Sequence, residues 1–293
     1  MKNFTKKMAA LLLALALLCG PGVIAANASP ADTHAGKTFV VLGDSIAAGI
    51  GAAREEYAYA RLVADELGLT LAKHAVPGHT SSDLLNILAE DEAAKQSIRQ
   101  ADIINVSIGG NDLLAANVIR LLLRILTLND DSGLDPVIEA FQERFALIVE
   151  QLRALNSDAL LIVQTPYNAM ERVPFVENAY EAAALRLRQV LYDYLAQHPG
   201  AFVIGDVFSA FKGREGLISN DRLHPSDAGH AMIARVVSAA ITGETLQLEP
   251  PPEYTPTLWQ QIVFFIRAFV DYFRHFLSYM SVWDLIRNAI RFF

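Results

Sequence analysis

Cysteine is almost absent from this chain of 293 residues, because Cys19 is its only one. No disulfide can therefore form within the chain, which excludes the small secreted domains that depend on disulfides. Leu18 precedes Cys19, whereas a lipid-modified cysteine would follow a small residue. We therefore expect no lipidation, and a fold stabilised by the packing of its hydrophobic residues, which make up 53% of the chain.

Positive charge is also scarce in this sequence. Lys and Arg number 24 against 32 Asp and Glu, which gives a formal net charge of −8. The chain has no run of basic residues, although proteins that bind nucleic acids use basic patches to neutralise phosphates. We therefore expect no nucleic acid as a partner.

The N-terminus lacks an apolar run long enough to cross a bilayer. Its run extends only from Met8 to Leu18, whereas a transmembrane helix needs about 20 apolar residues. Three lysines precede the run, and an Ala-Asn-Ala sequence ends at Ala28. This pattern is typical of a secretory signal peptide. We predict a signal peptide over 1–28, a flexible start over 29–36 and a secreted, extracellular protein.

Five short apolar runs alternate with segments of helical periodicity in the next part of the chain. Runs of this kind are typical of strands buried on both faces of a parallel sheet. Strands that alternate with helices predict an α/β fold with helices on both sides of the sheet. We expect one such domain over 37–243, with strands at 37–44, 69–76, 101–108, 159–164 and 201–204.

One of the helices has a clear start and a clear apolar stripe. Asp135 is expected to be its N-cap, with Pro136 at the first helical position. The apolar residues that follow recur at helical spacing, and they are Val137, Ala140, Phe141, Phe145, Ile148, Val149 and Leu152.

Polar residues and glycines follow the first three strands. In a parallel sheet the ligand site forms at the carboxyl ends of the strands. Ser45 follows the first strand, Gly78 the second and Asn111 the third. A serine hydroxyl can be a nucleophile, and a glycine N–H or an asparagine amide can donate to an oxyanion. Each motif alone is more typical of a helix cap or a turn than of a catalytic site.

A histidine with a nearby carboxylate comes near the end of the domain. Asp221 lies three residues before His224, so in a tight loop it can accept from Nδ1–H and leave Nε2 free to accept a proton. Asp44, next to the serine, is interpreted as a residue that orders its loop. His79 and His230 are assigned to packing or to hydrogen bonding in loops.

These four segments together resemble the GDSL or SGNH hydrolase family of secreted bacterial esterases, lipases and lysophospholipase-like enzymes. The resemblance implies a flavodoxin-like three-layer α/β/α fold with a five-stranded parallel sheet. It implies a catalytic triad of Ser45, Asp221 and His224. It also implies an oxyanion hole formed by Ser45, Gly78 and Asn111. No cofactor and no metal are needed.

The expected reaction is ester hydrolysis through an acyl-enzyme on Ser45. Leu113, Leu114 and the segment 118–126 are unusually apolar for residues beside an active site, and they can line an acyl pocket or pack as a buried helix. They favour fatty acyl or lysophospholipid esters as substrates. The alternatives are a carbohydrate O-acetylesterase and a catalytically silent extracellular binding protein on the same fold.

The chain ends in a proline-rich linker, 244–256, and a tail, 257–293. Apolar residues in the tail recur every three or four positions, which predicts amphipathic helices. Four arginines against two aspartates make the tail positive. Such a helix can lie in a membrane interface and bring the protein to the outer membrane surface or the cell envelope. Docking onto the catalytic domain and self-association are the alternatives.

Overall fold

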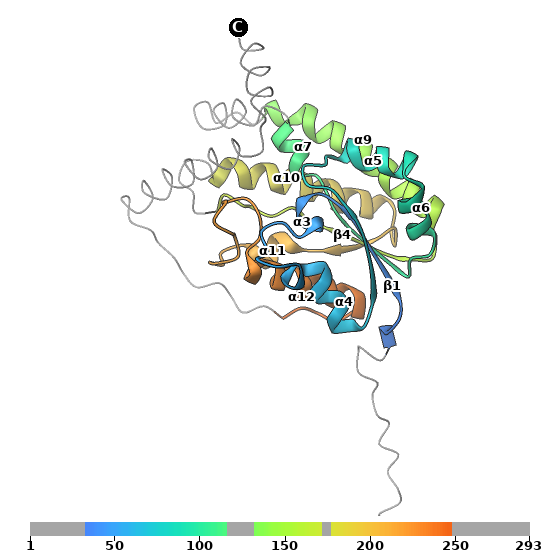
Figure 1. Ribbon diagram of the computed structural model, residues 1–293. Coiled ribbons are helices and arrows are strands. Elements are labelled where there is room, and N and C mark those ends of the chain that lie inside the picture. Colours follow the sequence, from blue (N-terminus) through green and yellow to red (C-terminus); the bar gives the residue numbers. More distant parts are fainter. Residues whose placement is uncertain (1–32, 116–131, 172–176, 248–293) are drawn as a thin grey trace, which may run out of the picture.

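The computed structural model describes residues 33–115, 132–171 and 177–247 (Figure 1). The predicted signal peptide, the apolar segment 118–126 and the tail 257–293 lie outside the described residues. So does most of the predicted linker. The described residues contain one sheet with helices on both of its faces.

Five parallel strands form the sheet, in the order β2-β1-β3-β4-β5. This confirms the predicted flavodoxin-like fold. The strands are β1 (Thr38–Gly43), β2 (Thr70–Ala75), β3 (Ile103–Ser107), β4 (Leu160–Gln164) and β5 (Val203–Gly205). The chain leaves β1 for β2 on one side and later returns to β3 on the other side. The strand order therefore switches between β1 and β3, where α/β proteins form their ligand sites.

Two helical layers cover the sheet (Figure 1). One layer contains α5 (Ser81–Glu90), α6 (Glu92–Arg99), α9 (Asp135–Leu155) and α10 (Glu177–Gln197). The other contains α4 (Tyr59–Leu67), α11 (Val207–Phe211) and α12 (Asp227–Thr242). Alternate residues of β1 supply the two cores, with Val40 and Leu42 in the first layer and Phe39 and Val41 in the second. No helix in the described ranges combines the length and apolar character needed to cross a membrane.

Shorter elements follow the strand ends and shape the connections. They are α3 (Ser45–Ala48), α7 (Gly110–Ala115) and two 3-10 helices, η1 (Glu55–Tyr57) and η2 (Ser132–Leu134). Both α3 and α7 start at the carboxyl ends of strands, β1 and β3 respectively. The elements that carry the predicted serine and asparagine are therefore neighbours at the switch in strand order.

The start of α9 differs from the prediction that Asp135 is its N-cap. Asp135 is instead the first helical residue, and Leu134 takes the N-cap position without a side-chain hydrogen bond. The 3-10 helix η2 leads directly into α9, so the chain is already wound before the expected cap. The Asp135 carboxylate accepts a hydrogen bond from Arg186 on α10 instead. Phe141, Phe145 and the following stripe are buried as expected.

A buried polar cluster lies at the centre of the sheet. Asn105 on β3 is fully buried, and its Oδ1 accepts from the Tyr59 hydroxyl at 2.8 Å and from Gln164 Nε2 at 2.7 Å. Its Nδ2 donates to the carbonyl of Ile162 on β4. The cluster thus joins α4, β3 and β4 with directional bonds in an otherwise apolar core.

Candidate active site

Ser45 lies at the carboxyl end of β1, as the first residue of α3. Gly43 makes this turn possible with a φ of +131°, and a Cβ on it would lie 1.9 Å from the carbonyl oxygen of Ser107. The end of β1 therefore contacts β3 closely, and Asp44 N donates to the same carbonyl at 3.1 Å. Because Ser45 begins the helix, its N–H has no acceptor within α3.

His224 contacts both the serine and the aspartate. Its Nε2 lies 2.9 Å from Ser45 Oγ, and its Nδ1 lies 2.6 Å from Asp221 Oδ2. The serine and the histidine are 179 residues apart in the sequence. The structure thus brings the three residues predicted to form a triad into one hydrogen-bonded chain, with both Ser45 and His224 largely buried.

The loop around Asp221 holds the carboxylate in its ionised form. Burial alone would raise the pKa of Asp221, but a stronger opposite effect comes from hydrogen bonds donated by His224, Leu223 and Ser219. These bonds hold the pKa of Asp221 well below its usual range. An ionised carboxylate accepts from Nδ1–H and so leaves Nε2 of His224 to accept the hydroxyl proton of Ser45.

Tyr167, which is outside the predicted set, holds this loop, and His230 joins two other segments of the chain. The Tyr167 hydroxyl donates to the Leu223 carbonyl at 2.7 Å, and its ring stacks on Phe211 with centroids 4.6 Å apart. His230 accepts from Tyr59 N, and its Nε2 lies 3.0 Å from the carbonyl of Ile50. His230 therefore bonds loops together, as expected from the sequence.

Of the predicted oxyanion donors, Asn111 lies at the cavity that contains Ser45, whereas Gly78 does not line it. Asn111 lines the same cavity as Ser45 and His224. Its Nδ2 donates to the carbonyl of His79 at 2.9 Å, which leaves the second amide proton for a ligand. Gly78 comes one residue before His79 in an exposed turn with φ +87°. It is not among the described residues that line this cavity, so its role stays a prediction.

Ser81 and Asp112 join the loops that carry these donors, and sequence reasoning missed them. Ser81 N donates to Asp112 Oδ2 at 2.9 Å, and the Ser81 hydroxyl donates to Oδ1. Arg144 on α9 lies 3.5 Å from the same carboxylate. We name this contact the Ser81–Asp112 clamp. Its sequence signal was weak, because the two residues are 31 positions apart and each resembles an ordinary cap.

Asp44 caps the short helix that starts at the serine. Its carboxylate accepts from Ile46 N at 3.0 Å, as a loop-ordering residue does. Burial raises the pKa of Asp44 to about 7, more than the hydrogen bonds from backbone N–H groups lower it. His224, and not Asp44, holds the Ser45 hydroxyl, so Asp44 is not placed as the base.

The cavity beside Ser45 extends between three elements. Leu113 and Leu114 on α7 line it, as do the end of β4 with its following loop and the first half of α10 with Tyr180 and Ala184. Its polar lining includes Gln164 and other groups at the strand ends. Within the described ranges, no three His, Cys, Asp or Glu residues gather as a metal ion would require.

Comparison with known proteins shows a match to one family of hydrolases and to one bacterial relative. The model of the GDSL-like lipase/acylhydrolase family matches residues 41–232. An uncharacterised protein of Bacillus subtilis (strain 168), YpmR, is 28% identical over 225 residues, which are 71% of this chain and 82% of that protein.

Solved structures with the same fold include two lipases and a phospholipase. The lipase Lip_vut3 from a goat rumen metagenome has a TM-score of 0.56 at 23% identity, over 70% of this chain and 97% of that one. The extracellular lipase from Streptomyces rimosus has a TM-score of 0.53 at 20% identity, over 70% and 99%. Phospholipase A1 from Streptomyces albidoflavus NA297 has a TM-score of 0.52 at 22% identity, over 72% and 100%.

Proposed function

Because this chain belongs to the GDSL-like lipase/acylhydrolase family, we propose that it hydrolyses carboxylic esters with Ser45 as the nucleophile. The observation that carries the proposal is the hydrogen-bonded chain from Ser45 Oγ through His224 to Asp221. A serine that is only a helix cap has no need of a histidine whose other nitrogen faces an ionised carboxylate.

The proposed reaction has two steps. His224 Nε2 takes the hydroxyl proton as Ser45 Oγ bonds to the ester carbonyl carbon, and it then gives that proton to the leaving alcohol. The acyl group remains on Ser45. Water then attacks the acyl carbon and gives its proton to His224, and Ser45 regains a proton as the carboxylic acid leaves. Asp221 stabilises the imidazolium that forms in each step.

The oxyanion of each step would be stabilised by three donors. They are the N–H groups of Ser45 and Gly78 and the Nδ2 amide of Asn111. Donors placed in advance at such a site contribute about 3 kcal/mol each to stabilisation of the transition state. The contact between Asn111 and the His79 carbonyl supports this role, because it fixes the orientation of the amide.

The substrate we propose is a fatty acyl or lysophospholipid ester. The apolar lining of the cavity beside Ser45 supports this choice. A carbohydrate O-acetylesterase would gain nothing from longer acyl chains, and a silent binding protein would hydrolyse none. A panel of p-nitrophenyl esters of increasing chain length separates these three functions.

The test of the mechanism is the loss of activity in Ser45→Ala and His224→Ala. Each change should lower kcat by about three orders of magnitude or more, because triad residues act as a unit. Ser82→Ala, at an exposed serine of α5, is the matched control and should keep full activity. Thermal melts of each variant check the fold. Comparable turnover in Ser45→Ala and the wild type would end the serine mechanism.

We also propose secretion and contact with a membrane. Both rest on the sequence of segments outside the described residues, the signal peptide over 1–28 and the positive amphipathic tail over 257–293. A secreted enzyme that lies in a membrane interface meets lipid esters directly.

A further inference from the structure

The cavity between α7 and α10 reaches the proposed nucleophile. Its lining includes Ser45, Leu113 and Leu114 as well as Tyr180 and Ala184 on α10. We propose that this cavity holds the acyl chain of the ester, and that Ala184 sets the longest chain it accepts. The inference rests on the proposed function, because it names where one part of the substrate lies.

The side chains that line the cavity favour an uncharged acyl chain over an anionic group. No lysine or arginine is among the described residues that line the cavity. A phosphate would therefore find no cationic partner in this part of the wall, although phosphates are usually held by such groups. Apolar side chains of Leu113, Leu114 and Ala184 and the ring of Tyr180 offer contacts that a hydrocarbon chain can use.

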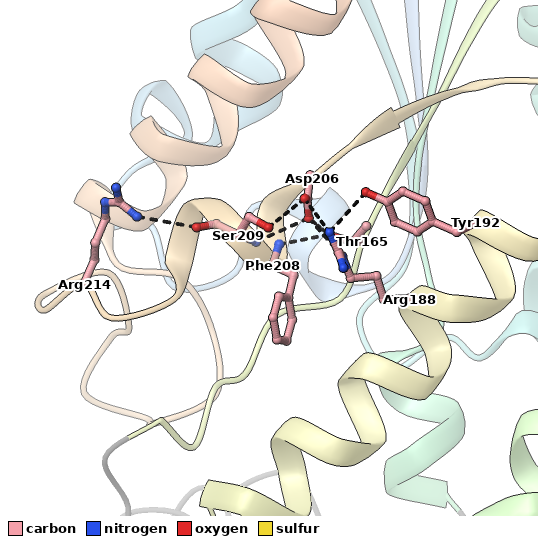
Figure 2. A network of polar contacts seen from close by, with 7 residues as sticks. All are labelled: Thr165, Arg188, Tyr192, Asp206, Phe208, Ser209 and Arg214. Carbon is pink, nitrogen blue, oxygen red and sulfur yellow. Dashed lines mark hydrogen bonds and ion pairs between the residues drawn. The ribbon is translucent and has the colours of Figure 1, made fainter. Parts of the chain in front are cut away.

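Two polar side chains that line the cavity near the strand ends, Gln164 and Thr165, already bond within the protein. Gln164 Nε2 donates to Asn105 at 2.7 Å. Thr165 Oγ1 donates to Asp206 Oδ1 at 3.2 Å and accepts from Phe208 N at 2.9 Å (Figure 2). These contacts use one donor of the Gln164 amide and the Thr165 hydroxyl, which are then not available to a sugar hydroxyl. The cavity therefore fits an acyl chain better than a polar alcohol.

An ion pair anchors the helix that carries Ala184. Arg188 lies one turn after Ala184 on the same face of α10. Its guanidinium reaches Asp206 just after β5, with Nη2 at 2.8 Å from Oδ2 and Nε at 3.3 Å from Oδ1 (Figure 2). The same carboxylate holds Thr165 of the cavity wall.

Aromatic contacts add to this anchor. Arg188 lies over the Tyr192 ring at 4.7 Å and the Phe208 ring at 5.6 Å. The wall at Ala184, which is 1% exposed, is therefore fixed against the strand ends. A larger side chain at this position must extend into the cavity, because the helix behind it has little freedom to move away.

The test is Ala184→Phe, compared with Ala182→Phe on the same helix. Ala182 is partly exposed and is not among the residues that line the cavity. We expect Ala184→Phe to lower kcat/KM for p-nitrophenyl octanoate by about tenfold or more, since an apolar pocket discriminates this strongly for even one methylene. Acetate should change by less than about threefold, and Ala182→Phe should change neither ester.

Several results would overturn the inference while leaving the hydrolase function in place. They are an equal effect of Ala184→Phe on both esters, no effect on either, and a wild type that gains nothing beyond acetate. Failure of the proposed function itself is different, because Ser45→Ala would then be as active as the wild type, or the wild type would hydrolyse no ester.

A second variant covers the case in which Ala184→Phe does not fold. Ala184→Gly removes the side chain that we propose limits the chain length, and so enlarges the cavity at the same point of α10. It should raise the ratio of kcat/KM for dodecanoate to that for octanoate by about threefold or more. An unchanged ratio in this variant would also overturn the inference.

Discussion

Asp44 puts an ionisable carboxyl group in the core, directly before the proposed nucleophile. It is 3% exposed, and burial raises its pKa to about 7. In the unfolded chain the pKa of an aspartate is about 3.9. The folded protein therefore keeps this proton to a higher pH than the unfolded chain does. The proton on Asp44 therefore stabilises the folded state. This contribution to the free energy of unfolding is fully present below about pH 4 and is lost as pH rises through 7.

We predict that Asp44→Asn raises the free energy of unfolding at pH 8 but not at pH 4. The amide oxygen can still accept from Ile46 N, while the side chain no longer ionises in the core. The gain should be a few kcal/mol at most, at about 1.4 kcal/mol per pKa unit. Urea unfolding at both pH values measures it, with Asp91→Asn at the exposed cap of α6 as the control. An equal gain at both pH values would contradict this explanation.

The residues of the proposed triad were accessible from the sequence because each lies in a short local motif. Ser45 follows a buried strand, and Asp221 and His224 are three positions apart. The residues that hold them were not accessible in this way. Tyr167 reaches Leu223 from 56 positions away, and no local pattern identifies such a partner.

At the scale of elements, the Ser81–Asp112 clamp joins the loop after β2 to the loop after β3. We predict that Asp112→Ala lowers kcat about tenfold or more with a smaller change in KM, because the Asn111 amide loses its fixed position. In an Asn111→Ala background the same change should have little further effect. Steady-state kinetics of the four proteins of this cycle measure the coupling.

Asp102→Ala is the matched control for the clamp. Asp102 accepts a hydrogen bond from Thr38 N at the opposite, amino-terminal edge of the sheet. The distance is 2.8 Å, close to the 2.9 Å between Ser81 N and Asp112 Oδ2 in the clamp. Its loss should leave the ratio of kcat to KM unchanged. Fully additive effects of Asp112→Ala and Asn111→Ala would show that the clamp has only a structural role.

All five strands could be predicted to within two residues. The central strands β1, β3 and β4 are buried on both faces and are therefore nearly continuous apolar runs, whereas the edge strands β2 and β5 are more exposed. The start of α9 could not be predicted in this way. Asp135 has the composition of a cap, but its partner Arg186 is 51 positions away on α10. A local sequence pattern shows which hydrogen bonds a side chain is able to form. Elements that are distant in the sequence determine which of these bonds it does form.

At the scale of the whole molecule, acidic and basic parts of the sequence are separated. The chain has a net charge of −8, yet the tail over 257–293 is positive. If the tail lies in a membrane interface as proposed, its arginines should favour anionic lipids. The five strands, both cores and the proposed catalytic residues all lie within residues 33–247.

We predict that removal of 257–293 abolishes binding to anionic vesicles and leaves hydrolysis of p-nitrophenyl acetate within about twofold. Sedimentation with anionic and with uncharged vesicles measures the binding, and the uncharged vesicles are the control for charge. If the shortened protein melts at a lower temperature and exposes hydrophobic surface instead, the tail packs on the domain and the membrane proposal is wrong.

The polar cluster around Asn105 also affects how reliably the chain reaches this fold. Apolar contacts between parallel strands discriminate poorly between neighbouring registers, since one aliphatic side chain replaces another at similar cost. A shift of β3 by one residue would move Asn105 to the other face of the sheet and leave the Tyr59 hydroxyl and the Gln164 amide buried without their acceptor. A sheet in the shifted register therefore has a higher free energy, and Asn105 specifies the register of β3.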